Sequence, residues 1–218
     1  MICSKGETMN SGYNTQISKH YAAYRPPIHQ RLLGQILSGR PNFKLGVDIG
    51  CGTGVSSYAL EAHCMRVVGL EPSDDMLAQT RETAKTQFVQ GAGENLPFED
   101  NTVDIVTFAG SLFYAKSLSL VTEIVRTCHQ QTLIVVYDFE VQLAEWMKLL
   151  GIEMASSSSN YDHACNFSGY PQFLERECHE GSIHLSVTPK QMAHVLFSSQ
   201  RRYQAYRINM AMRPLIRF

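Results

Sequence analysis

The stretch KLGVDIGCGTGVSSYALEAHCMRVVGLEP, which runs from Lys44 to Pro72, decides the fold. It begins with an apolar run around Asp48 that has the character of a buried strand, and a glycine-rich turn follows. The amphipathic segment Val55–Cys64 then predicts a helix. A second apolar run, Val67–Leu70, ends in the carboxylate of Glu71. This order of strand, glycine turn, helix, strand and acid is half of a nucleotide-binding α/β fold.

The residues in and around the turn indicate which class of nucleotide ligand it binds. The dinucleotide fingerprint needs glycine at its sixth position, and Val55 stands there instead. Asp48, two residues before the turn, would repel a pyrophosphate seated on the helix N-terminus. These two residues argue against an NAD-linked oxidoreductase. A carboxylate at this place suits a ligand with a cationic amino group, such as S-adenosylmethionine, which also carries a sulfonium and no phosphate.

Glu71 follows the turn by about 20 residues, the spacing of the acid that takes ribose hydroxyls in such folds. VDIGCGTG followed by GLEP resembles the first two motifs of the class I S-adenosylmethionine-dependent methyltransferases. The alternative is a tight turn in an α/β domain without a ligand. The resemblance implies a cofactor site built from Asp48, Gly50, Cys51, Gly52, Thr53, Gly54, Glu71, Pro72, Met76, Gly93, Glu94 and Ala109, with Tyr21 and Arg25. For Met76, packing on adenine and packing in the core remain equal alternatives.

A second stretch, GAGENLPFEDNTVDIVTFAGSLFY at residues 91–114, is similar to the adenine-side loop and fourth strand of the same class. It departs from the family pattern at Ala92, where an aspartate often takes the adenine amino group. Glu94 and backbone carbonyls would be the acceptors that remain. Ala109 ends the fourth strand, so the loop after it should face the methyl group. Phe113 and Tyr114 there either shape the acceptor pocket or belong to the edge of the core.

Two regions outside these motifs contain further candidate site residues. The pattern Y-x-x-Y-R-P, with Tyr21 and Arg25, resembles the N-terminal cap of methyltransferases of the trans-aconitate methyltransferase kind. This resemblance implies a lid over the cofactor; the alternative is a surface segment. Beyond residue 150 the periodicity is lost. His163 and Tyr170 are acceptor-pocket candidates there, although a lone loop histidine is more often simply solvated.

The alternation of elements predicts an α/β fold: a Rossmann-like, doubly wound, mostly parallel sheet with helices on both faces. We expect one methyltransferase domain over residues 1–218, divided into an N-terminal lid with helices (1–40), a cofactor-binding core (41–150) and helical or loop additions (151–218). Further strands are expected at Thr86–Gln90, Thr102–Ala109 and Thr132–Phe139. Further helices are expected at Ile28–Leu37, Ser73–Lys85, Leu118–Cys128, Val141–Leu150 and Thr188–Phe197. Ser182–Val187 and Tyr203–Met210 are weak candidates for a closing strand pair.

Net charge, cysteine pattern and the N-terminal sequence argue against several classes of protein. A net charge of −1 and a pI near 6.7 leave no electrostatic footprint for nucleic acid or anionic membrane. The one dense basic stretch lies near the end of the sequence and comprises Arg201, Arg202, Arg207, Arg213 and Arg217. Six cysteines without a C-x-x-C pair indicate free thiols and no metal site. Residues 1–12 lack the apolar core of a signal peptide, so we expect a cytoplasmic protein. We also expect it to be a monomer or a homodimer.

The expected function is in-line transfer of a methyl group from S-adenosylmethionine to a small-molecule acceptor, with S-adenosylhomocysteine as the product. A carboxylic acid is one candidate acceptor, because Arg25 could pair with it bidentately. The absence of an N-P-P-Y type tetrapeptide after the fourth strand argues against methylation of amide nitrogens. Two alternatives remain: a non-catalytic protein of this fold that binds S-adenosylmethionine or a metabolite, and an RNA or protein methyltransferase.

Overall fold

The computed structural model describes residues 20, 23–152, 160–199 and 202–207 of the 218-residue chain. The chain divides into two compact units. Unit 1 comprises Met1–Pro26, Val141–Ser158 and Ser182–Phe218, and unit 2 comprises Pro27–Glu140 and Ser159–Gly181.

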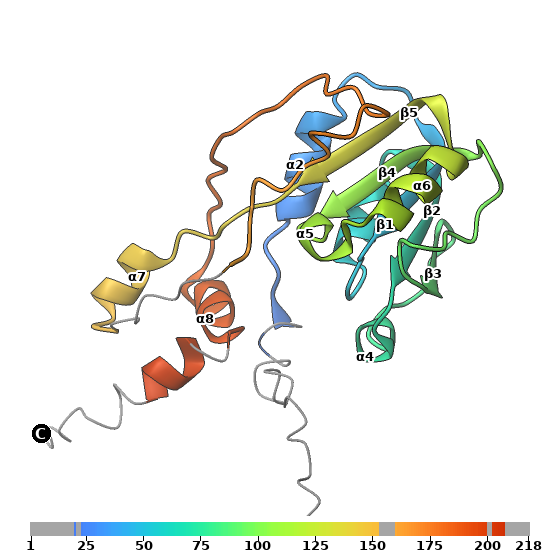
Figure 1. Ribbon diagram of the computed structural model, residues 1–218. Coiled ribbons are helices and arrows are strands. Elements are labelled where there is room, and N and C mark those ends of the chain that lie inside the picture. The colour runs from blue at the N-terminus through green and yellow to red at the C-terminus, as the bar shows by residue number, and fades with distance from the viewer. Residues whose placement is uncertain (1–19, 21–22, 153–159, 200–201, 208–218) are drawn as a thin grey trace, which may run out of the picture. The chain divides into compact units, whose positions relative to one another are not determined.

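Unit 2 is built on a five-stranded sheet whose strand order is β3-β2-β1-β4-β5 (Figure 1). All four strand pairs are parallel. The strands are β1 (Phe43–Ile49), β2 (Cys64–Glu71), β3 (Thr86–Gln90), β4 (Val103–Ala109) and β5 (Cys128–Tyr137). The order reverses between β1 and β4, so the ligand-binding crevice of such sheets is expected beyond the carboxyl ends of these two strands.

Helices lie on both faces of the sheet, because alternate residues of each strand point to opposite faces. On one face, Leu33 of α2 (Ile28–Ile36) and Leu60 of α3 (Val55–Leu60) pack against Val67, Ile105 and Val135. On the other face, Leu120 and Ile124 of α6 (Leu118–Thr127) and Leu112 of α5 (Leu112–Ala115) pack against Val47, Val106 and Phe108. The expected doubly wound α/β class is therefore confirmed.

Three helices are clearly shorter than expected, among them the one predicted for Val141–Leu150, which is observed as α7 (Ala144–Leu149). The helix predicted for Val55–Cys64 ends at Leu60, and β2 begins already at Cys64. The helix predicted for Ser73–Lys85 stops as α4 (Asp74–Leu77). Ser73 does cap it, accepting from the backbone N–H of Met76. Beyond it, the Thr83 hydroxyl accepts from the backbone N–H groups of Lys85 and Thr86, which stabilises a turn in place of a further helical turn.

Unit 1 contains α7 (Ala144–Leu149), α8 (Pro189–Phe197) and a helical segment over residues 202–207. Thr188 caps α8 as predicted, with a full capping box to Gln191 and Pro189 in the first turn. The buried residues Leu143, Met147, Ile152 and Leu196 form its core. The described parts of Ser182–Val187 and Tyr203–Met210 contain no strand, so a closing strand pair is absent from the described residues.

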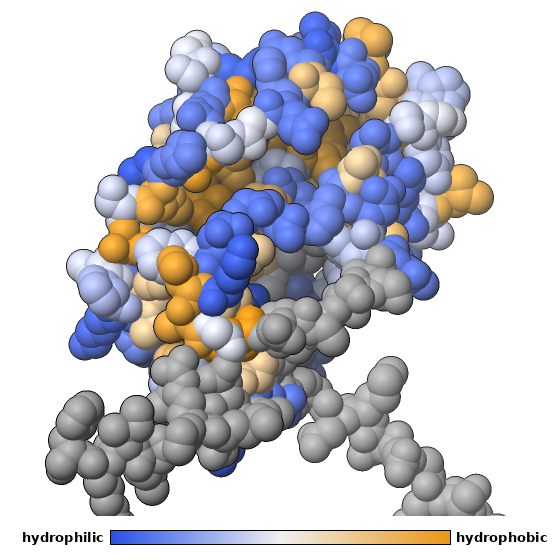
Figure 2. Space-filling model, turned by 90° about the vertical axis from the view of Figure 1, so that its left-hand side faces the viewer, coloured by the Kyte–Doolittle hydropathy of each residue, from blue (hydrophilic) through white to orange (hydrophobic). Residues whose placement is uncertain are grey.

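Apolar side chains also reach the surface. Met65, Leu118 and Leu174 of unit 2 are each more than half exposed. Figure 2 shows hydrophobic residues in orange between hydrophilic residues in blue on one face of the molecule. Over β1, β2 and β3 an open groove of about 300 Å³ is lined by Leu45, Val68, Val89 and Phe98 among others. No helix in the described part of the chain has the length and apolar character needed to cross a membrane.

Candidate functional site

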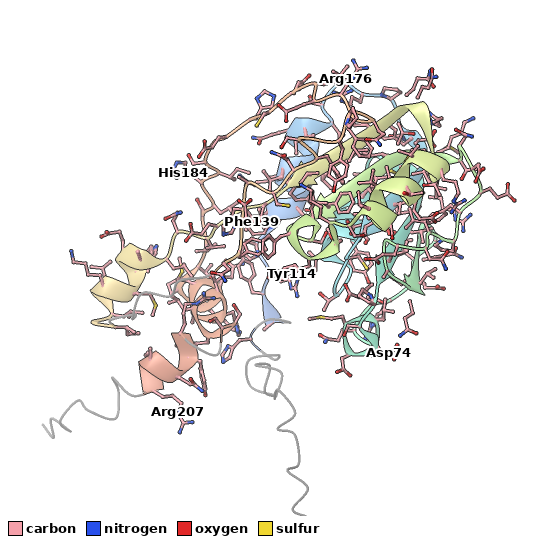
Figure 3. All side chains as sticks on the ribbon, in the orientation of Figure 1. Asp74, Tyr114, Phe139, Arg176, His184 and Arg207 are labelled. Carbon is pink, nitrogen blue, oxygen red and sulfur yellow. The ribbon has the colours of Figure 1, made fainter. Side chains whose placement is uncertain are left out.

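The carboxyl ends of β1, β2, β4 and β5 lie at one edge of the unit 2 sheet, because all its strands are parallel. In Figure 3, Tyr114 follows β4, Phe139 follows β5 and Asp74 begins α4 after β2. The residues predicted from the glycine turn and from the loop after β4 are therefore brought to one edge.

Asp48 is completely buried in the penultimate position of β1. Its Oδ2 accepts hydrogen bonds from the hydroxyls of Ser56 (2.6 Å) and Ser57 (2.7 Å), both on α3. Its Oδ1 accepts from Thr107 on β4 at 2.8 Å. Burial raises the pKa of Asp48, and the nearby charge of Glu71 adds to this, while the three hydroxyls oppose it. Asp48 therefore joins β1, α3 and β4 beneath the glycine turn.

Glu71 connects the end of β2 to the glycine turn. Its Oε2 accepts from the backbone N–H of Gly52 at 2.9 Å, and its Oε1 accepts from the backbone N–H of Ser73 at 3.0 Å. The side chain is largely buried, but each carboxylate oxygen has a second lone pair. Glu71 can therefore orient the turn and still accept hydrogen bonds from a ligand.

The glycine turn itself is packed on one side and open on the other. Gly50, Gly52 and Gly54 all have positive φ, which residues with a Cβ adopt only with strain. A Cβ at Gly50 would lie 2.6 Å from the Cβ of Ser111, and one at Gly54 would lie 2.7 Å from the ring of Phe88. At Gly52 a Cβ would meet nothing within 4 Å. Open space therefore lies next to the backbone of Gly52, where a ligand is expected.

Two further residues of the turn differ in exposure. Cys51 is buried, and burial raises the pKa of its thiol to about 12, with smaller contributions from Asp48 and Glu71. A thiol with this pKa stays protonated at neutral pH and is a poor nucleophile. Thr53 is half-buried, and Pro72 at the end of β2 is exposed. Met76, in the first turn of α4, is half-buried.

The predicted adenine-side loop follows β3. Gly93 is buried against Leu120, while Ala92 and Glu94 are exposed. The rest of the loop is tied down by Arg126 of α6, whose guanidinium donates to the carbonyls of Leu96 and Phe98 and pairs with Glu123. The exposed carboxylate of Glu94 makes one long contact, accepting from the Ser117 hydroxyl at 3.4 Å. It therefore has capacity left for a ligand.

A polar cluster lies at the carboxyl ends of β4 and β5. Asp138 directly follows β5, and its Oδ2 accepts from the Tyr161 hydroxyl at 2.7 Å. The same oxygen lies 2.8 Å from Nδ1 of His163. The Tyr161 hydroxyl is also 2.9 Å from the carbonyl oxygen of Gly110, the residue after β4. Burial raises the pKa of Tyr161, and the hydrogen bond and charge of Asp138 raise it further, so the phenol stays protonated. We call Asp138, Tyr161 and His163 the Asp138 cluster.

Aromatic rings surround this cluster. The ring of Tyr161 lies 4.9 Å from that of Phe113, 5.5 Å from that of Tyr114 and 4.7 Å from the imidazole of His163. Phe113 and Tyr114 are exposed, so they belong to the surface of this edge and not to the core. Tyr170 instead packs against Phe167 and lies under the ammonium of Lys116, 5.5 Å from its ring. Phe113, Tyr114 and His163 are thus brought together; Tyr170 shows no contact with them.

The two lid candidates stand apart. Tyr21 lies outside the described residues. Arg25 is half-buried and belongs to unit 1, whereas the glycine turn belongs to unit 2. Sequence reasoning also missed two residues of the edge, Asp138 and Tyr161. Asp138 could have been found, because it is an acid directly after a predicted strand of a parallel sheet. Tyr161 lies in a segment without periodicity and carries no such signal.

The chain is similar to known methyltransferases. Residues 47–136 match the family model described as a methyltransferase domain. Over 87 residues the chain is 39% identical to a cypemycin N-terminal methyltransferase of a Streptomyces species, covering 38% of this chain and 35% of the relative. It is 41% identical over 76 residues to a demethylmenaquinone methyltransferase of Corynebacterium kroppenstedtii, covering 35% and 32%. Thus the chain spans about a third of the length of these curated relatives.

Two further similarities have the same character. A probable S-adenosylmethionine-dependent methyltransferase, CRG1, of Saccharomyces cerevisiae is 30% identical over 106 residues, which cover 44% of this chain and 36% of the relative. Among solved structures, a SAM-dependent methyltransferase from Aquifex aeolicus overlaps with a TM-score of 0.48 at 17% identity. That overlap covers 58% of this chain and 74% of the other.

Proposed function

We propose that the protein transfers a methyl group from S-adenosylmethionine to a small-molecule acceptor, because residues 47–136 match the model of a methyltransferase domain and the chain is similar to a probable S-adenosylmethionine-dependent methyltransferase. The observation that carries this proposal is the carboxylate of Glu71, held against the open backbone of Gly52 at the end of β2. A ribose needs an acceptor for its hydroxyls beside a turn that leaves it room, and this pair of residues supplies both.

The residues present fit the cofactor. Glu71 retains lone pairs for the ribose hydroxyls, and Gly52 borders open space. Asp48 is completely buried with three hydroxyl donors, so it would not contact the ligand's ammonium as an exposed partner. It would act by its negative charge and by holding the turn in shape. Glu94 and backbone carbonyls of the loop after β3 are the acceptors available to an adenine amino group in place of the aspartate that Ala92 replaces.

The bound cofactor supplies an electrophilic methyl group. The chain has to bind it, place an acceptor in line with the methyl carbon and exclude water, and positioning of this kind can lower a barrier by about 7–11 kcal/mol at best. The loop after β4 is the part of unit 2 suited to hold the acceptor. Ser111 contacts the glycine turn through Gly50, and its hydroxyl donates to the carbonyl of Ile49, while Phe113 and Tyr114 present exposed rings.

Two acceptor classes follow from different residues. Arg25 favours a small carboxylic acid, which needs no general base. Small acceptors of other kinds would rely on the polar and aromatic groups at the ends of β4 and β5. A net charge of −1 favours either class over nucleic acid.

The test is calorimetric titration with S-adenosylmethionine and S-adenosylhomocysteine, on wild type, Glu71→Gln and Asp48→Ala. We expect micromolar affinity for both ligands in wild type and a loss of at least tenfold in each variant. Gln79→Ala, an exposed change on the same side of β2 that touches no part of the turn, is the matched control and should leave affinity unchanged. A panel of small acids and hydroxyl compounds is then screened for methyl transfer. No binding by wild type would overturn the proposal. Binding without transfer to any acceptor would favour a cofactor-sensing protein.

A further inference from the structure

The Asp138 cluster is held together by hydrogen bonds to one carboxylate. Asp138 is an acid on the loop after β5, yet it collects three donors: the backbone N–H of Phe139 on Oδ1, and Tyr161 and His163 on Oδ2. Two of these donors come from a segment without regular structure, about 25 residues further along the chain. The arrangement therefore fixes the position of two side chains at the expected ligand edge.

His163 is oriented by this contact. Because the Asp138 carboxylate faces Nδ1, the Nδ1–H group donates a hydrogen bond to it. Nε2 is then the nitrogen that can accept a proton. The His163 side chain is 56% exposed, whereas that of Asp138 is only 19% exposed. Nε2 makes no hydrogen bond to any described residue. A histidine whose one nitrogen is held by a carboxylate and whose other nitrogen is accessible has the form of a general base.

The cluster is also continuous with the proposed cofactor site. The Tyr161 hydroxyl, which donates to Asp138, also lies 2.9 Å from the carbonyl oxygen of Gly110. The next residue, Ser111, packs on Gly50 of the glycine turn. A Cβ at Gly110 would lie 3.1 Å from Oδ1 of Asp138, so the glycine allows this close approach. All these residues belong to unit 2. The basic nitrogen and the glycine turn are thus parts of one edge, linked through two adjacent residues.

We propose that His163 is the general base of the proposed methyl transfer, and that the acceptor is an aromatic hydroxyl compound. Asp138 is its positioning residue, and Tyr161, which donates to Asp138, lies beside the carbonyl of Gly110. The exposed rings of Phe113 and Tyr114 offer flat apolar surface for an aromatic acceptor beside the imidazole. The carboxylate of Asp138 would repel an acidic acceptor, whereas a neutral hydroxyl enters without this penalty. This inference rests on the proposed function.

The step balances as follows. The acceptor hydroxyl gives its proton to Nε2 of His163, and its oxygen forms a bond to the methyl carbon. The bond from that carbon to the sulfonium breaks with its electron pair left on sulfur. His163 then releases the proton to water, so no further reactant is needed. A carboxylate acceptor, already deprotonated, would gain nothing from His163.

A test that does not depend on turnover uses 4-nitrophenol, whose phenolate absorbs visible light and whose neutral form does not. The dye is titrated into full-length protein saturated with S-adenosylhomocysteine, at a pH near the dye's own pKa. We expect the bound dye to be enriched in phenolate in wild type, with a matching protonation of His163 seen by NMR. His163→Gln should abolish the enrichment, and Asp138→Asn should reduce it several-fold. Tyr161→Phe should reduce it less, because the ring remains.

His179→Gln is the matched control. His179 is an exposed histidine of the same unit that also contacts a carboxylate, Glu177 at 3.3 Å, but no ring contact involving it is found among the described residues. It should leave the dye response unchanged. Because His163 and His179 are both exposed, neither substitution should lower stability. The titratable groups that surround His163 are Asp138, Tyr161 and, close to Tyr161, Tyr114 and Cys165. The NMR titration therefore follows His163 itself, assigned by its loss in His163→Gln.

The outcomes separate this inference from the proposed function. If S-adenosylhomocysteine binds and wild type shows no phenolate enrichment, the base assignment is wrong and the methyltransferase proposal stands. The same holds if His163→Gln keeps the enrichment. If S-adenosylhomocysteine does not bind, the proposed function fails. The dye titration is then carried out without S-adenosylhomocysteine, and the base assignment is still judged by phenolate enrichment in wild type and by its loss in His163→Gln. For any hydroxyl acceptor found in the screen, His163→Gln should lower kcat at least tenfold near neutral pH and less at high pH, with KM little changed.

Discussion

Thr107 on β4 donates a hydrogen bond of 2.8 Å to the buried carboxylate of Asp48 on the neighbouring strand β1. In the register of the parallel β1–β4 pair, Asp48 lies directly opposite Thr107. This bond links the two halves of the sheet directly beneath the glycine turn. It therefore ties the shape of the proposed cofactor site to the packing of the sheet.

Thr107→Val should destabilise the protein. The change keeps the side-chain volume but removes one of three donors from a buried carboxylate, which should lower the free energy of unfolding by about 1–3 kcal/mol. Urea unfolding followed by circular dichroism measures this. Thr122→Val, an exposed threonine of α6, is the control and should change stability little. Equal stability of Thr107→Val and wild type would mean that the bond contributes nothing net.

Asp48→Asn should separate stability from binding. Because the folded-state pKa of Asp48 is raised, its protonated form is favoured by folding; that stabilisation is present below the unfolded value of 3.8 and is lost as pH rises through the folded-state pKa. At neutral pH the charged carboxylate therefore costs stability, and a neutral amide of the same shape removes this cost. We expect a Tm equal to or above that of wild type at neutral pH, with the difference shrinking in acid.

The same variant should bind S-adenosylmethionine at least tenfold more weakly, because the negative charge that favours the ligand's ammonium is gone. Calorimetry provides this measurement. A large drop in Tm together with unchanged affinity would contradict both halves of the prediction.

Gly52→Ala and Gly54→Ala form a matched pair. Both residues have positive φ, so each alanine should cost about 1–2 kcal/mol from the backbone alone. At Gly54 the new methyl would also press on Phe88, which should cost a further ~1–3 kcal/mol. At Gly52 the methyl enters open space, so Gly52→Ala should fold and yet lose cofactor affinity. Chemical denaturation and calorimetry on both variants test this; Gly52→Ala binding as tightly as wild type would contradict the assigned ligand position.

His20 in unit 1 should titrate below its ordinary value of 6.5. Its Nδ1 lies 3.1 Å from Nδ1 of His194, and rings of Phe197 and Tyr203 pack beside it. Burial lowers the pKa of His20, and the charge of His194 lowers it further. The folded state thus binds fewer protons than the unfolded one, so the stability of this contact is present above pH 6.5 and is lost as pH falls.

NMR titration of the His20 ring, assigned with His20→Gln, should give a midpoint below 6.5. In His194→Gln the midpoint should rise, since the second positive charge is removed. A midpoint at or above 6.5 in wild type would show that the pair does not form as described.

Much of this architecture could be predicted from the sequence, because it depends on local patterns. The alternation of apolar runs with amphipathic segments predicts β1 to β5, and Ser73 and Thr188 carry cap chemistry that the structure confirms. Helix lengths were predicted less well. α4 ends at Leu77 because the Thr83 hydroxyl stabilises a turn further on, a competition that periodicity does not reveal.

The candidate site was only partly predictable for the same reason. Asp48 and Glu71 stand in a motif, but the donors of Asp48 come from α3 and from Thr107, which is 59 residues away. The Asp138 cluster joins residues from β5 and from an aperiodic segment, and such contacts depend on tertiary packing. Tyr161 has no sequence signal, and His163 gains a distinctive environment only through Asp138.

The parallel order of the sheet also has a kinetic consequence. β1 pairs with β2, and β4 pairs with β5, through single intervening connections, whereas the β1–β4 pairing closes a loop of 59 residues at Asp48 and Thr107. Closing the longer loop costs more chain entropy, so this pairing should form last in folding. The ligand edge would then exist only once the two halves have met. Thr107→Val should accordingly accelerate unfolding in stopped-flow experiments and leave the refolding rate nearly unchanged.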